Sequence, residues 1–215
     1  MLQSIKANDG KFIPAKISTP VAPNHPGAII LPSKPDVNGA VANFAKMLTD
    51  NGFACCLPST GVDVQGAIKR LSRSISHSKI SWDIGELDHA MRHMRSTPGS
   101  NGKVAVIGFG RGGQQAYLAA CRLNPEAAII YQGTSIDDFL EEGRHIDCET
   151  VFHTGRKDPY MTDEADRRIH AALIGKFNIA IYKYHAGEAF TDEDDPVNYV
   201  REAALLAHRR TLDVL

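Results

Sequence analysis

The sequence has few cysteines, no excess of charge of either sign and no long apolar run. Its 24 basic and 25 acidic residues leave a formal net charge of -1 over 215 residues. This balance gives no electrostatic reason to expect binding to nucleic acid or to a membrane surface. No segment approaches the ~20 consecutive apolar residues that a membrane-spanning helix needs. We therefore expect small molecules or proteins as partners; the oligomeric state stays open.

The first residues, MLQSIKANDGKF, lack the basic start and the apolar stretch of a secretory signal. Cysteines at positions 55, 56, 121 and 148 show neither the paired spacing of a zinc site nor the density of a disulfide scaffold. We expect a cytoplasmic protein whose cysteines are reduced and mostly buried, without a metal or cofactor.

With 43% hydrophobic residues, the chain is long enough to bury one sizeable core. Buried-strand patterns such as GAIILPS and KVAVIGFG alternate with amphipathic segments to the end of the chain. Strands that read as continuous apolar runs, separated by helices, indicate a mostly parallel sheet covered on both faces. We predict a single α/β domain over residues 1–215.

Local signals refine this fold. Two short alternating runs around Asp9-Gly10, in SIKANDGKFIPAKIST, predict an N-terminal β-hairpin. Helical stripes occur at Val41, Phe44, Ala45 and Leu48, with Gly52 as a helix-ending residue, and again at Ile84, Leu87, Met91 and Met94.

Ligands of an open parallel sheet collect at the carboxyl ends of its strands. Three such ends carry distinctive residues, namely VAVIGFGRGGQQAY, VFHTGRKDPY and YHAGEAF. Their order along the chain matches the order of nucleophile, acid and histidine in an α/β-hydrolase.

The sequence resembles the dienelactone hydrolases, which are small single-domain α/β-hydrolases. The resemblance covers nearly the whole chain and is most specific across DIGELDHAMRHMRSTPGSNGKVAVIGFGRGGQQAYLAA, with support from FHTGRKDPYM, AGEAF and ALLAHRRTLDVL. It implies an α/β-hydrolase fold and, for the family, hydrolysis of esters or lactones by a cysteine, a histidine and an aspartate.

Three family positions fall on Gly110, Asp158 and Glu188. The family turn G-x-C-x-G-G becomes GFGRGG, so the nucleophile position holds Gly110, and the family's A-G-H-x-F becomes AGEAF, so the histidine position holds Glu188. Only the acid, Asp158, keeps its type. Glycine supplies no nucleophile, and a carboxylate does not replace a neutral imidazole unless its pKa is raised.

The resemblance also implies substrate-binding positions. A carboxylate that the family keeps near its nucleophile falls at Ser33, and an arginine that binds the substrate carboxylate falls at Asp192. Backbone N–H groups of Lys34 and Arg111 lie where an oxyanion hole is expected. We regard Ser33, Lys34, Arg111 and Asp192 as candidate ligand-binding residues.

Three functional classes stay open on this evidence. The first is a non-hydrolytic small-molecule-binding or regulatory protein with a degenerate triad, a pseudoenzyme. The second is a hydrolase or lyase that acts on small esters or lactones through Asp158 and Glu188, which we expect to lie close together. The third is a protein-interaction subunit.

Other candidates receive simpler interpretations. His89 and His93 have the i, i+4 spacing of a metal pair but lie off the apolar stripe, so we expect a solvated face. His185 precedes Glu188 by three residues and would need a local rearrangement to act as a base. The acidic run at residues 193–195 reads as the solvated start of the last helix.

Overall fold

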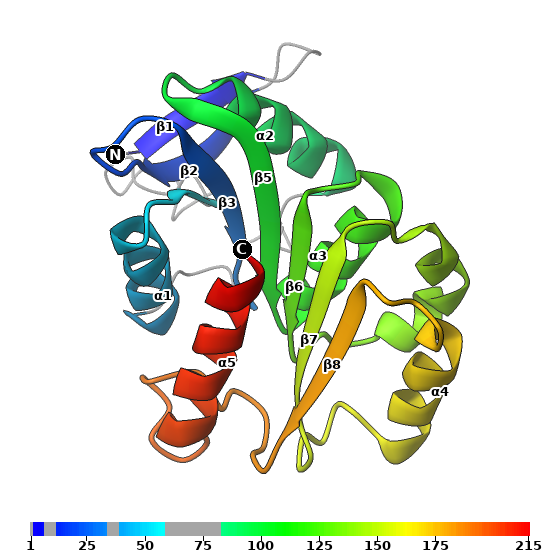
Figure 1. The fold of residues 1–215 in the computed structure, drawn as a ribbon. Coiled ribbons are helices and arrows are strands. Elements are labelled where there is room, and N and C mark those ends of the chain that lie inside the picture. The colour runs from blue at the N-terminus through cyan, green and yellow to red at the C-terminus, as the bar shows by residue number, and fades with distance from the viewer. Residues whose placement is uncertain (1, 7–11, 34–38, 59–82) are drawn as a thin grey trace, which may run out of the picture.

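The computed structural model describes residues 2–6, 12–33, 39–58 and 83–215 (Figure 1). Its strands are β1 (Leu2–Lys6), β2 (Phe12–Ser18), β3 (His25–Leu31), β4 (Ala54–Pro58), β5 (Ser100–Phe109), β6 (Ala127–Tyr131), β7 (Glu149–Gly155) and β8 (Ile179–Tyr184). The helices are α1 (Gly39–Asp50), α2 (Ile84–Ser96), α3 (Arg111–Arg122), the 3-10 segment η3 (Ile136–His145), α4 (Asp163–Leu173) and α5 (Arg201–Val214).

The strands form one sheet in the order β1-β2-β4-β3-β5-β6-β7-β8. β2 runs antiparallel to both of its neighbours, and the pairs from β4 through β8 are parallel. The predicted fold is therefore confirmed, including the N-terminal hairpin of β1 and β2. The Asp9-Gly10 turn of that hairpin lies outside the described residues.

Helices cover both faces of the sheet, as the alternation of apolar strands and amphipathic segments predicts. α1 and α5 pack on one face, while α2, α3, η3 and α4 pack on the other (Figure 1). The predicted helical stripes are buried in these two cores, with Ile84 only half-buried. This arrangement leaves the carboxyl ends of the parallel strands at one edge of the layers, where loops and helix starts meet.

Two further expectations concern single residues. Gly52, just after α1, has a φ of 91°, which is the left-handed conformation expected where a helix ends. Cysteines 55, 56, 121 and 148 are free and buried.

Among the described helices, none has the length and apolarity required to cross a bilayer.

Candidate functional site

The turn from β5 into α3 has an unusual backbone. Gly110 caps the start of α3 with a φ of 53° and a ψ of −114°, a combination that strains any residue with a Cβ. We call residues 108–113 the elbow. Two other glycines of the elbow are required for steric reasons. A Cβ at Gly108 would lie 1.9 Å from Gly112 O, and a Cβ at Gly112 would lie 2.1 Å from Leu31 O.

The elbow is tied to the strand beside it. The N–H of Gly110 donates to Tyr131 O at the end of β6, at 2.8 Å. The carbonyl of Gly110 accepts from the N–H of Gln114 and from that of Thr134, each at 3.2 Å. Backbone hydrogen bonds therefore hold Gly110 in place, and no side chain at position 110 is needed to form the sharp turn.

Ser33 lies directly against the elbow. A Cβ added to Gly110 would be 2.9 Å from the Cβ of Ser33, which is closer than real Cβ atoms approach. Ser33 is exposed, as is Arg111 at the first position of α3. Lys34, the other residue expected here, lies outside the described residues.

Asp158 follows β7 and is buried, with 8% of its surface exposed. Its Oδ1 accepts a hydrogen bond from the backbone N–H of Tyr160 at 2.9 Å. Burial raises the pKa of the Asp158 carboxyl, and hydrogen bonds from the backbone of Tyr160 and Met161 oppose this rise. The carboxyl therefore holds a proton more readily than an exposed aspartate does.

Glu188 is half-buried in the loop after β8. This loop contacts the loop that carries Asp158, because the N–H of Lys157 donates to Ala186 O at 2.9 Å. The two carboxylate-bearing loops are therefore held side by side through their backbones. The expected close approach of the Asp158 and Glu188 side chains stays a prediction.

Gln132 is a residue that the sequence analysis missed. It follows β6 with a φ of 51°, and its N–H donates to His153 O at 2.8 Å. Its buried side chain donates from Nε2 to Gly187 O, also at 2.8 Å. Since the same strand end holds Gly110, Gln132 links the elbow to the loop of Glu188. A polar residue followed by glycine directly after the apolar run AAIIY is the signal that marks it.

The acidic segment near the end of the chain has a role that we did not expect. Asp194 Oδ2 accepts from the N–H of Ala40 at 3.2 Å, and Glu193 accepts from Asn43 Nδ2 at 3.1 Å. Glu193 and Asp194 are exposed, as expected, but the interpretation of residues 193–195 as the start of the last helix is wrong, because α5 begins at Arg201. Half-buried Asp192 accepts from the N–H of Asp194 at 3.1 Å and so shapes this cap.

A buried hydrogen-bond network holds Tyr131 at the end of β6. His153 Nδ1 lies 2.8 Å from Tyr184 Oη, and its Nε2 lies 3.0 Å from Thr211 Oγ1. Thr211 Oγ1 is 2.7 Å from Tyr131 Oη. Burial lowers the pKa of His153 to about 3, so the imidazole is neutral. Because Tyr131 O holds Gly110, this network supports the elbow from below.

Three further histidines were candidates on the sequence. His89 Nδ1 lies 2.6 Å from Gly85 O within its own helix, and both His89 and His93 are half-buried, so the expected solvated face is only partly realised. His185 is exposed. Within the described ranges, no three histidine, cysteine or acidic side chains are grouped so that they could hold a metal ion.

Comparison with known proteins shows which family the sequence matches. The model of the dienelactone hydrolase family matches residues 13–215. The carboxymethylenebutenolidase of Pseudomonas putida is 26% identical over 223 residues, covering 99% of this chain and 94% of that protein. Carboxymethylenebutenolidase 1 of Cupriavidus pinatubonensis is 31% identical over 132 residues, covering 61% and 56% of the two chains.

A solved structure shows the same fold. The crystal structure of a putative dienelactone hydrolase from Klebsiella pneumoniae superposes with a TM-score of 0.78 at 19% identity. The match covers 100% of this chain and 96% of that one. The described part of the chain therefore has the same fold as that structure.

Proposed function

Since the chain belongs to the dienelactone hydrolase family, we propose that it binds a small molecule at the elbow without hydrolysing it by the family's cysteine route. In this role it acts as a binding or regulatory protein. The observation that carries the proposal is the elbow, which has the strained backbone of a nucleophile-bearing turn but holds glycine at position 110.

Glycine at this position has a physical consequence. A nucleophile with a Cβ would bear the strain of a φ of 53° and a ψ of −114°, whereas glycine adopts this region at little cost. Exchanging a strained catalytic residue for an unstrained one trades activity for stability. Glycine at position 110 therefore avoids the backbone strain that a nucleophile would bear there.

None of the four cysteines is suited to replace the missing nucleophile. Cys121 is buried on α3, and burial raises the pKa of its thiol to about 12. Burial also raises the pKa values of Cys55, to about 11, and of Cys56 and Cys148. A thiol in this state holds almost no thiolate at neutral pH, and the thiolate is the nucleophile.

The hydroxyl of Ser33 is the nearest alternative. Its Oγ would lie 4.0 Å from a Cβ placed at Gly110. A serine hydroxyl attacks only when an adjacent base takes its proton, and the family's base position holds Glu188. We therefore assign Ser33 to ligand contact, together with Lys34, Arg111 and Asp192. The first N–H groups of α3 have no partner inside the helix and favour an anionic group of the ligand.

One observation favours a second candidate, a hydrolase or lyase that moves protons through Asp158 and Glu188. A buried carboxyl with a raised pKa, such as Asp158, is typical of a general acid. In this case activity would survive alkylation of thiols and would be lost in Glu188→Gln.

The test is the initial rate of hydrolysis of p-nitrophenyl acetate and a dienelactone. It compares the wild type with Asp158→Ala and with Ser33→Gly/Gly110→Cys/Glu188→His, in which the serine is removed because it would contact a new Cβ at position 110. We expect the wild type at background and the triple variant above it. Wild-type activity that Asp158→Ala abolishes would show that the site is catalytic and would overturn the proposal.

A thermal-shift screen with small anionic compounds then tests binding directly. A compound that binds only the folded state stabilises it by RT ln(1 + [L]/Kd) and so raises the melting temperature. We expect at least one stabiliser, whose effect is lost in Ser33→Trp, which fills the space beside Gly110. If no compound stabilises the protein and changes at positions 33, 110 and 188 have no effect, an interaction subunit is the better description.

A further inference from the structure

The backbone of the loop after β8 is strained next to Glu188. We call residues 186–189 the Glu188 loop. Ala189 in this loop has a φ of 51°, the left-handed conformation that a residue with a Cβ rarely adopts. Such a conformation persists only where contacts with the surrounding structure hold it. The Glu188 loop therefore depends on anchors outside itself.

Two anchors come from the neighbouring strand ends. The carbonyl of Ala186 accepts from the N–H of Lys157, which follows β7, at 2.9 Å. The carbonyl of Gly187 accepts from Nε2 of Gln132, which follows β6, at 2.8 Å. Of the two donors only Gln132 uses its side chain, so only this anchor depends on the type of residue at its position.

The carbonyl of Gly187 lies in a restricted space. A Cβ added to Gly155, the last residue of β7, would be 2.5 Å from Gly187 O, so this oxygen packs directly against a glycine backbone. Gln132 is buried, with 8% of its surface exposed. A carbonyl that is shielded from water in this way is costly to leave without its donor.

The side chain of Gln132 bridges two strand spacings. β7 lies between β6 and β8, and neighbouring strands are about 4.8 Å apart, so the ends of β6 and β8 are roughly 10 Å from each other. Gln132 has a φ of 51°, and its N–H donates to His153 O at the end of β7. These two features fix the backbone from which the side chain reaches Gly187.

We propose that Gln132 is a positioning residue, whose side-chain amide holds Glu188 at a fixed place relative to the elbow. The preceding residue holds the elbow, because Tyr131 O accepts from the N–H of Gly110 at 2.8 Å. Two consecutive residues at the end of β6 thus anchor both halves of the site. This role rests on the proposed function, because a ligand that lies between the elbow and the Glu188 loop requires a fixed separation of the two.

Amide hydrogen exchange in the full-length wild type and in Gln132→Leu measures the anchor without any ligand. Leucine has a similar volume but no donor. We expect exchange at the N–H of Lys157, which is bound to the loop, to become roughly 10- to 100-fold faster, because one shielded hydrogen bond is lost. Exchange at the N–H of Gly110 should stay within about twofold of its wild-type rate. An unchanged rate at Lys157 would overturn the proposal.

The matched control is Gln114→Leu. Gln114 Nε2 also donates to a backbone carbonyl, that of Ser135, at 3.0 Å in the segment after β6. The same residue type and the same kind of hydrogen bond are therefore lost, but in a bond that does not involve the Glu188 loop. We expect exchange at the N–H of Lys157 to be unchanged in this variant.

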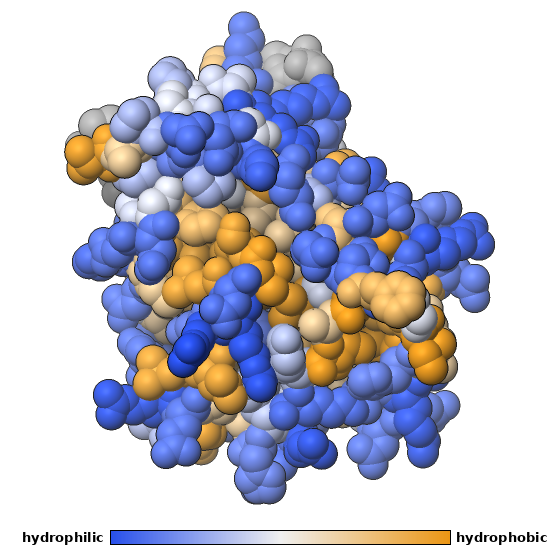
Figure 2. All heavy atoms as spheres, in the orientation of Figure 1, coloured by the Kyte–Doolittle hydropathy of each residue, from blue (hydrophilic) through white to orange (hydrophobic). Residues whose placement is uncertain are grey.

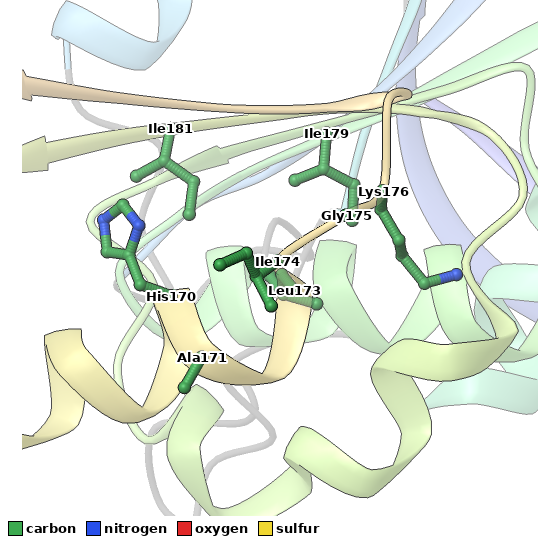
Figure 3. A pocket seen from close by; sticks show the side chains of 8 residues that line it. All are labelled: His170, Ala171, Leu173, Ile174, Gly175, Lys176, Ile179 and Ile181. Atoms are coloured by element: carbon green, nitrogen blue, oxygen red, sulfur yellow. The ribbon is translucent and has the colours of Figure 1, made fainter.

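A second control loosens β8 at its opposite end. There Ile179 and Ile181 line an apolar groove of about 350 Å³ together with the end of α4 (Figure 3). Figure 2 shows hydrophobic residues gathered over the end of α4 and the start of β8. Ile179→Ala removes packing from the strand that leads into the Glu188 loop and leaves Gln132 in place. Equal acceleration at Lys157 in Ile179→Ala and Gln132→Leu would mean a general loss of stability and would overturn the proposal.

Gln132→Glu adds a pH dependence to the same measurement and replaces Gln132→Leu if that variant does not fold. A protonated glutamate still donates to Gly187 O, whereas a carboxylate only accepts and repels this carbonyl. Glutamate titrates near pH 4.3 when exposed, and burial raises this pKa. At each pH, exchange at Lys157 is compared with the wild type, and we expect the ratio to rise as the glutamate ionises. Accelerated exchange whose ratio is constant between about pH 4 and pH 8 would exclude the hydrogen bond as the cause.

Hydrolysis by a restored variant reports the position of residue 188. Gln132→Leu is added to Ser33→Gly/Gly110→Cys/Glu188→His, and the hydrolysis of p-nitrophenyl acetate is measured. Misplacing a reacting group by about 1 Å costs roughly 100-fold in rate, so we expect kcat to fall by about this factor with little change in KM. An unchanged kcat would overturn the proposal. A restored variant that is itself at background contradicts the proposed function, and hydrogen exchange then decides the role of Gln132.

Discussion

Replacing Gly110 by alanine tests the elbow at the level of single atoms. The new Cβ meets two separate obstacles. One is the backbone itself, because a φ of 53° with a ψ of −114° is unfavourable for any L-residue. The other is Ser33, whose Cβ would be 2.9 Å away.

The two obstacles contribute unequally to the loss in free energy of unfolding. Holding a non-glycine residue in such a backbone region costs about 2 kcal/mol, and crowding against Ser33 adds about 1 kcal/mol. We therefore expect Gly110→Ala to lower the free energy of unfolding by about 3 kcal/mol. In a domain of this size that corresponds to a fall of roughly 6–12 °C in melting temperature.

A double-mutant cycle separates the two contributions. Gly110→Ala is measured by thermal and urea unfolding in the wild type and in Ser33→Gly, where the crowding is removed. We expect the cost to fall to about 2 kcal/mol in the second background, which is a coupling of about 1 kcal/mol.

Gly52→Ala is the matched control. Gly52 also has a positive φ, of 91°, but a Cβ there would meet no atom of the described residues within 4 Å. Its cost should be about 1 kcal/mol and the same in both backgrounds. The reasoning is refuted if Gly110→Ala is tolerated within about 0.5 kcal/mol, or if Ser33→Gly leaves its cost unchanged.

Two further predictions concern titration. Burial lowers the pKa of His153 to about 3 and that of His208 to about 4. Both values lie below the pKa of about 6.5 that a histidine has in the unfolded chain. The folded protein is therefore most stable above pH ~6.5 with respect to these groups and loses stability as the pH falls. Urea unfolding between pH 7 and 4 should show a weaker pH dependence for His208→Phe than for the wild type, and equal slopes would contradict this. Burial raises the pKa of Asp158, so its charged form is destabilised and stability is lost as the pH rises through its titration range. Asp158→Asn should therefore raise the melting temperature at pH 7 but not at pH 3, and a lower value at pH 7 would mean that the carboxylate has a stabilising partner.

Much of the fold follows from patterns that are local in the sequence. The stripe at Val41, Phe44, Ala45 and Leu48 needs only helical periodicity to predict a helix and its buried face, and this helix packs as expected. The glycines around position 110 likewise mark a tight turn before any neighbour is known. Such features depend on the conformational preferences of short segments, which the order of residues determines.

The site depends on contacts between segments that are distant along the chain. Ser33 lies against Gly110 because β3 and β5 are neighbours in the sheet. Gln132 contacts Gly187 because the carboxyl ends of β6 and β8 lie at the same end of the sheet, on either side of β7. Asp194 caps α1 across 154 positions of sequence. The residue pattern of these segments does not predict which distant segment each one contacts.

The amino-acid sequence by itself therefore determined the helices, the strands and the sharp glycine-rich turn around Gly110. Only the tertiary structure decided which side chains stand beside that turn and which loop Gln132 holds. The physical reason is that periodicity and backbone preference act over a few residues, whereas strand order is set by the packing of the whole sheet between its two helical layers.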